Sequence, residues 1–112
     1  MIDIPYQGII RLNSVEKMAI RSFKDREVET FFYKGRLPRK RAWMSIAKIV
    51  LRKLDMLHYA KELTDLRCPP SNHLESLERD LFGYYSIRIN NQWRLVFKWD
   101  YCPYDVQIMD YH

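Results

Sequence analysis

The residues best suited to chemistry lie in the last quarter of the sequence. The final three, Asp110-Tyr111-His112, place a carboxylate, a phenol and an imidazole side by side. An imidazole has an ordinary pKa of about 6.5, so it can give or take a proton near neutral pH. Upstream, Arg88 and Arg94 carry guanidinium groups, whose fork of N–H donors matches a phosphate. Proton-transfer groups beside phosphate-binding groups predict cleavage of an RNA phosphodiester, without a metal ion or other cofactor.

The two arginines belong to a predicted hairpin. Residues 84–90 and 93–99 alternate between apolar and polar side chains, as strands with one buried face do. A three-residue turn at 90–92, with an Asn in the left-handed conformation, pairs apolar side chains with apolar ones and sets Arg88 directly opposite Arg94. A two-residue turn would mix the two faces. The pattern therefore predicts the three-residue turn.

Directly opposed arginines weaken a sheet, since like charges repel across the pair. The pair Arg88 and Arg94 therefore favours an anion, such as a phosphate, bound between the two guanidinium groups. The alternative is that both side chains extend into water or are neutralised by Asp110 or Glu75.

Further cations could contact RNA outside this pair. Lys98 shares a strand face with Arg94, and the run Arg39-Lys40-Arg41 precedes the second predicted helix. This run could follow an RNA backbone, or it could equally be a solvated face. His73 could share the polar surface of the arginines, although a lone histidine is more often a surface or packing residue.

The elements that must position these residues are predicted from hydrophobic periodicity. The order is strand, two helices and four strands (β-α-α-β-β-β-β), which indicates an α+β fold with a mainly antiparallel sheet. The predicted elements are a strand at 18–24, helices at 26–34 and about 43–58, a loop at 64–72, and strands at 73–78, 84–90, 93–99 and 104–110. The polar side of the second helix includes Lys53. The last strand should hold the terminal triplet in place, although chain ends are often unordered.

Size and composition predict one basic domain. The chain has 112 residues with 47% hydrophobic side chains, and Lys and Arg outnumber Asp and Glu by 19 to 14. A basic domain suits polyanions such as nucleic acid, although charge alone fits a generic basic protein as well. Residues 18–112 are expected to form the domain and residues 1–17 an N-terminal extension. We expect a cytoplasmic protein with two free thiols and no metal site, since neither signal peptide nor metal-ligand spacing is visible.

Four segments resemble the HigB toxins of type II toxin–antitoxin systems, in the RelE/ParE superfamily. These are residues 20–25, residues 66–70, the run Tyr85 to Arg94 (Tyr-Ser-Ile-Arg-Ile-Asn-Asn-Gln-Trp-Arg) and the terminal Asp110-Tyr111-His112. The resemblance implies a RelE-like fold and a ribosome-dependent mRNA endonuclease. It also implies a HigA-type helix-turn-helix antitoxin as partner, with which the toxin binds and represses its own operator DNA. By position, Arg94 resembles the family's phosphate-binding arginine and the terminal triplet its active-site residues.

The sequence departs from this family in the strand after the loop. Many members carry His and Lys where this chain has Glu75 and Glu78. Either Glu75 or His73 could then act as the base. Two rival functions are a ParE-like poison of DNA gyrase on the same fold and an RNA-binding module without catalysis.

Overall fold

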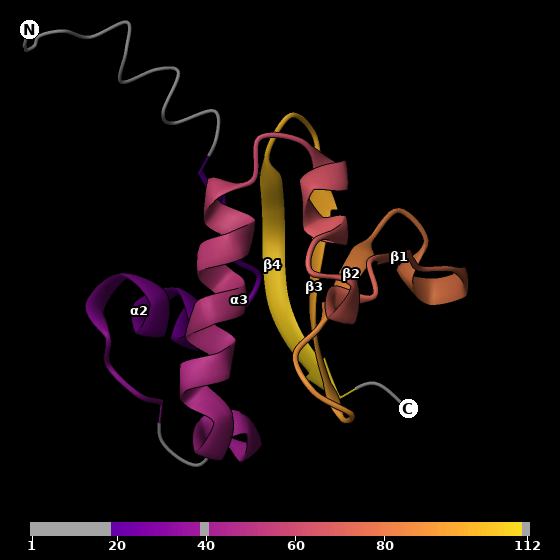
Figure 1. The fold of residues 1–112 in the computed structure, drawn as a ribbon. Coiled ribbons are helices and arrows are strands. Elements are labelled where there is room, and N and C mark those ends of the chain that lie inside the picture. The colour runs from indigo at the N-terminus through magenta and orange to yellow at the C-terminus, as the bar shows by residue number, and fades with distance from the viewer. Residues whose placement is uncertain (1–18, 39–40, 111–112) are drawn as a thin grey trace, which may run out of the picture.

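The computed structural model describes residues 19–38 and 41–110, and their centre is an antiparallel sheet in which each strand lies beside the next one in the sequence (Figure 1). The four strands are β1 (Glu75–Ser76), β2 (Tyr85–Arg88), β3 (Trp93–Trp99) and β4 (Pro103–Asp110). The α-helices α2 (Arg26–Lys34) and α3 (Ala47–Tyr59) lie together on one side of the sheet (Figure 1). The predicted α+β class with an antiparallel meander is confirmed.

Helix α2 begins and ends where the sequence predicts. Asp25 is its N-cap, since the Oδ1 atom accepts hydrogen bonds from the backbone N–H groups of Glu27 at 2.9 Å and Val28 at 3.4 Å. Gly35 follows the last helical residue with φ of 70°, a left-handed conformation that glycine adopts without steric strain. Local chemistry therefore sets both ends of this helix.

The second predicted helix is split into two parts. Ala42–Ile46 form a 3-10 helix, and the regular α-helix α3 starts at Ala47. Apolar residues at helical spacing in this region still contribute to the main core, although Leu51, predicted on the same apolar stripe, is exposed. From the helices this core takes Val28, Phe31, Trp43, Val50, Leu54 and Leu57, and from the sheet Ile87, Leu95, Phe97, Val106 and Ile108.

The predicted first strand is largely replaced by an irregular segment beside β4. The backbone N–H of Lys24 donates to the carbonyl of Val106 at 2.9 Å, but Phe23 makes a single parallel bridge, to Val106. Asp105 interrupts the ladder, since it has φ of 52° and its N–H donates to the Ser22 hydroxyl at 2.9 Å. On its other side β4 still pairs with β3 before and after Asp105, with a shift in register, but beside Phe23 only the single bridge forms.

The strand predicted at 73–78 is reduced to the two residues of β1. His73 has φ of 46° and Arg79 has φ of 58°, so extended backbone ends on both sides of β1. The predicted loop before it contains two short 3-10 helices, Leu63–Arg67 and Pro70–Asn72.

The hairpin between β2 and β3 has the predicted register. Ile87 pairs with Leu95, and Arg88 pairs with Arg94. The prediction of a left-handed Asn in the turn is wrong, because no residue of 90–92 has a positive φ. Instead, the side-chain Oδ1 of Asn90 accepts hydrogen bonds from the backbone N–H groups of Gln92 and Trp93, each at 2.8 Å. The side chain satisfies the turn, so the backbone does not need the unusual conformation.

The sheet face that points away from α3 carries a second, smaller apolar cluster. It consists of Leu77, Tyr84 and Val96, with Leu81 and Met109 packed against them. Because side chains alternate along a strand, Ser86, Arg88, Arg94 and Lys98 belong to this face too. The cations singled out from the sequence therefore lie opposite the helical layer.

Candidate active site

A polar cleft of about 190 Å3 lies beside the turn between β2 and β3. It is lined by His73, Arg88, Asn90, Asn91 and Arg94. The two arginines reach it because they are Cα partners in the hairpin. Three residues predicted for the site, His73, Arg88 and Arg94, thus meet in one cleft.

Arg94 is the most firmly held of these side chains. It is 7% exposed, its Nε donates to Ser86 Oγ at 2.7 Å, and its Nη2 donates to the backbone carbonyl of His73 at 2.6 Å. Glu75 pairs with Ser86 across β1 and β2, and its Oε1 lies 3.7 Å from Arg94 Nη2. Arg94 therefore reaches across β2 to the edge strand, with the hydrogen bonds that a buried cation needs.

Arg88 is held differently. It is half-buried, and its Nη2 donates to Oδ1 of Asn91 in the turn. Because Arg88 is tied to the turn and Arg94 to the edge strand, their guanidinium groups have separate anchors. Of the two alternatives raised from the sequence, neutralisation by Glu75 is present in part, since Glu75 contacts Arg94 at ion-pair distance while its side chain is 47% exposed.

Asp110 lies at the same end of the sheet but not on the same face. Its Cα partner is Trp93, whereas the partner of Arg94 is Met109. Since neighbouring residues of a strand point to opposite faces, Asp110 starts on the helical side. Its Oδ2 accepts a hydrogen bond from Gln92 Nε2 at 3.0 Å. Tyr111 and His112 lie outside the described residues.

The other predicted RNA contacts are not brought to the cleft. Lys98 is four residues along β3 from Arg94, about 13 Å by strand geometry, and its Nζ lies 5.0 Å from the centroid of the Tyr84 ring. The Tyr84 ring is itself buried in the second apolar cluster. Arg39 and Lys40 fall outside the described residues.

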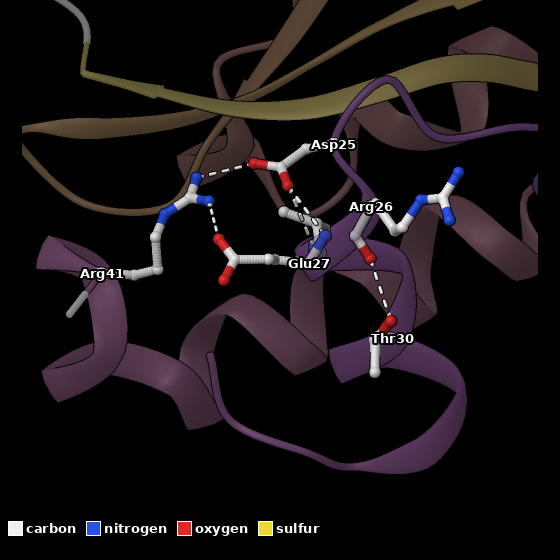
Figure 2. Close-up of polar contacts among 6 residues, drawn as sticks. Asp25, Arg26, Glu27, Thr30 and Arg41 are labelled. Carbon is white, nitrogen blue, oxygen red and sulfur yellow. Dashed lines mark hydrogen bonds and ion pairs between the residues drawn. The ribbon is translucent and has the colours of Figure 1, made fainter. Parts of the chain in front are cut away.

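Arg41 forms ion pairs within the helical layer instead of lying at the cleft. Figure 2 shows its guanidinium between two carboxylates, with Nη2 2.6 Å from Asp25 Oδ2 and Nη1 2.6 Å from Glu27 Oε1. The hydrogen bond to Asp25, and then that to Glu27, raises the pKa of Arg41 above its ordinary value. These two ion pairs join the start of α2 to the segment before α3. The structure therefore gives Arg41 two partners that compete with any RNA phosphate.

Two residues near the site were missed or misplaced in the sequence. Ser86 is fully buried under Arg94, and its place two residues before Arg88 on the same strand face was the available signal. Lys53, predicted on the polar side of its helix, is 8% exposed. The prediction for Lys53 was wrong because its Nζ meets Asn72 Oδ1 at 2.7 Å, a contact with no local sequence signal.

Among residues 19–38 and 41–110, no group of three or more His, Cys, Asp or Glu side chains could hold a metal ion. Cys68 is an exposed free thiol and Cys102 a buried one. None of the helices in this part of the chain is long and apolar enough to cross a membrane.

Comparison with known proteins identifies the family of this chain. The family model for the RelE-like toxin HigB of type II toxin–antitoxin systems matches residues 21–112. The chain belongs to this family. Toxin HigB-1 of Vibrio cholerae serotype O1 is 43% identical over 77 residues, which are 69% of this chain and 80% of that protein. An uncharacterized protein of Haemophilus influenzae is 46% identical over 56 residues, which are 50% of this chain and 55% of that protein.

Membership makes this chain a HigB-like toxin of a type II toxin–antitoxin system. A toxin of such a system implies an antitoxin as partner. RelE-like HigB toxins are generally endoribonucleases, which makes RNA the first ligand to test at the cleft.

Proposed function

We propose that this HigB-like toxin is an endoribonuclease that cuts mRNA on the ribosome and thereby stops translation. The observation that carries the proposal is the cleft at the hairpin, where Arg88 and Arg94 approach one small polar space from separate anchors. Two guanidinium groups around a space of this kind suit a phosphate, and above all the extra negative charge of a pentavalent phosphorus.

The proposed reaction is attack of the ribose 2′-oxygen on the neighbouring phosphorus. A base removes the proton of the 2′-hydroxyl while the new P–O2′ bond forms. An acid gives a proton to the 5′-oxygen as the P–O5′ bond breaks, which leaves a 2′,3′-cyclic phosphate and a 5′-hydroxyl. Arg94 and Arg88 hold the phosphate and stabilise the charge that develops on it.

Several groups are proposed for proton transfer. Glu75, whose carboxylate lies 3.7 Å from Arg94 Nη2, is a candidate base at the edge of the cleft. His112, with Asp110 and Tyr111, is proposed for the other proton transfers. This assignment is supported by the place of Asp110, which ends β4 and pairs with Trp93, the residue next to Arg94 on β3.

The proposed partners follow from the same family. We propose a HigA-type helix-turn-helix antitoxin that neutralises the toxin, and a toxin–antitoxin complex that binds and represses its own operator DNA. With ribosomal mRNA as its substrate, the toxin would act in the cytoplasm.

The test is to map mRNA 5′ ends after the toxin is induced in cells that lack the antitoxin. We expect new cuts within translated mRNA, and their loss in Arg94→Ala and His112→Ala. Tyr59→Ala, which alters an exposed aromatic residue on α3, should cut like the wild type. Intact transcripts with broken DNA would instead indicate a gyrase poison. Growth arrest that survives His112→Ala with transcripts intact would indicate an RNA-binding module without catalysis.

A further inference from the structure

Lys53 is a charged side chain buried in the helical layer. It lies on α3, 8% exposed, and its ammonium group contacts Asn72 Oδ1 at 2.7 Å. Burial, and then the nearby charge of Arg52, lowers the pKa of Lys53 below its ordinary value. Burying an ammonium group costs free energy unless polar partners compensate. An apolar residue at this position of the helix would avoid that cost, so the contact with Asn72 needs an explanation.

Asn72 is the centre of a buried polar link. It is completely buried, and its Nδ2 donates to the backbone carbonyls of Leu66 at 3.1 Å and Cys68 at 3.4 Å. The backbone N–H of Asn72 donates to the carbonyl of Pro69 at 2.9 Å. These bonds tie the segment 66–72 into one shape, and the bond from Lys53 fixes that shape to α3.

The next residue, His73, connects this loop to the cleft through its backbone. The turn gives His73 a left-handed conformation, with φ of 46° and ψ of 58°, and its N–H donates to the carbonyl of Pro70 at 3.1 Å. The carbonyl of His73 then accepts the hydrogen bond from Arg94 Nη2 at 2.6 Å. A shift of the loop would move this acceptor, because His73 directly follows Asn72, which is held by its hydrogen bonds to Lys53 and Leu66.

We propose that Asn72, anchored by Lys53, is a positioning residue that sets the guanidinium of Arg94 for phosphate binding. The link runs from α3 through Asn72 to the His73 carbonyl, and so from the helical side of the sheet to the cleft on its other face. This inference rests on the proposed function, because it assigns Arg94 to the phosphate.

The inference predicts a fall in kcat when the link is broken. A guanidinium displaced by about 1 Å loses much of its stabilisation of the transition state, which costs up to about 100-fold in rate. Binding of the substrate should change less, because the ribosome and the rest of the RNA remain in place. We therefore expect kcat to fall roughly 10- to 100-fold in Asn72→Asp with KM nearly unchanged. Asp keeps the shape of Asn and the contact with Lys53, but it removes the two N–H donors.

The decisive experiment is a double-mutant cycle on cleavage of ribosome-bound mRNA. Asn72→Asp is measured in the wild type and in Arg94→Lys, which keeps the charge and loses the fork of donors. If Asn72 acts through Arg94, its loss should cost less than about threefold once Arg94 is Lys. Equal losses in both backgrounds, or no loss in the wild type, would overturn the inference.

A second readout does not depend on activity. Hydrogen exchange of the Arg94 Nε–H, which donates to Ser86 at 2.7 Å in the wild type, is measured by NMR. We expect faster exchange in Asn72→Asp and in Lys53→Met, the latter keeping an unbranched side chain, one atom shorter, without the charge. Unchanged exchange in the folded variant would contradict the inference, and Lys53→Met serves if Asn72→Asp fails to fold.

Two controls separate positioning from general destabilisation. Ser71→Ala alters an exposed residue of the same loop, and Val28→Ala weakens the core from α2, away from this link. Both should keep the wild-type kcat and Nε–H exchange. If the wild-type toxin does not cut mRNA on ribosomes, the proposed function fails instead, and the exchange measurement still tests the link.

Discussion

Arg88 and Arg94 are direct partners across the β2–β3 hairpin, yet each is held by a different neighbour. Arg88 donates to Asn91 in the turn, whereas Arg94 donates to Ser86 and to the carbonyl of His73. The separate anchors reduce the repulsion that opposed cations would otherwise suffer. They also leave the two residues with unequal exposure, and unequal roles are expected from this difference.

Removing the buried arginine should harm the reaction more than removing its partner. For Arg94→Ala we expect kcat to fall about 100- to 1000-fold, in the range seen when a preorganised donor to a developing charge is lost. For Arg88→Ala we expect a smaller fall of roughly tenfold, because this half-buried side chain is more open to water than Arg94. Single-turnover cleavage of ribosome-bound mRNA, with saturating toxin, measures both. Equal effects of the two substitutions would contradict the unequal roles.

The hydroxyl of Ser86 should matter for stability. Ser86→Ala leaves the buried Nε–H of Arg94 without its acceptor at 2.7 Å, and a buried donor without a partner costs about 1–3 kcal/mol of unfolding free energy. Urea denaturation followed by circular dichroism measures this loss. Ser76→Ala, at an exposed position of β1, is the matched control and should change the unfolding free energy by less than about 0.5 kcal/mol.

The carboxylate of Asp25 has two functions that substitutions can separate. Asp25→Ala removes the N-cap of α2 and one partner of Arg41, and we expect a loss of about 1–2 kcal/mol in unfolding free energy (Figure 2). Arg41→Gln keeps the cap and removes only the partly exposed ion pairs, so we expect a loss below about 1 kcal/mol. Thermal unfolding at low and at high salt distinguishes them, since the ion-pair part should shrink with salt.

Neither of these substitutions should change the cleavage rate of the folded toxin, because Arg41 is paired with α2 rather than placed at the cleft. A loss of mRNA cutting in Arg41→Gln at unchanged stability would show instead that Arg41 contacts RNA, as the basic run in the sequence first suggested.

Stability should fall at mildly acidic pH because of His58. Its Nδ1 accepts the backbone N–H of Ile20 at 3.3 Å, so the ring is neutral in this arrangement. Burial lowers the pKa of His58 below its ordinary value of 6.5, with the opposing effect of Asp55 being smaller. The unfolded chain therefore binds more protons below pH 6.5. The contribution of His58 is complete above that pH and is lost as pH falls toward its lower folded pKa.

His58→Asn tests this pH dependence, because the Asn carbonyl can accept the same N–H but does not titrate. The midpoint of thermal unfolding, measured from pH 7.5 to pH 5, should fall less steeply in the variant than in the wild type. Other titrating groups are shared by both proteins, so the difference between the two curves isolates His58. Parallel curves would refute the assignment.

The sequence alone determined the features that depend on a periodic pattern or on neighbouring residues. The alternation along the hairpin decided its register, because a shift of one residue would have exposed every apolar side chain. Asp25 and Gly35 marked the ends of α2 through capping chemistry that involves only nearby residues. The candidate pair Arg88 and Arg94 followed from that register.

Only the tertiary structure decided which partners the charged side chains have. Lys53 meets a side chain 19 residues away, Arg94 meets a carbonyl 21 residues away, and Arg41 meets Asp25 across 16 residues. Likewise, the predicted first strand is reduced to a single bridge, which lies beside the left-handed Asp105. Such contacts depend on how the chain packs in space, and no periodic pattern encodes them. The sequence therefore does not distinguish a basic residue that is solvated from one that is buried or held in ion pairs.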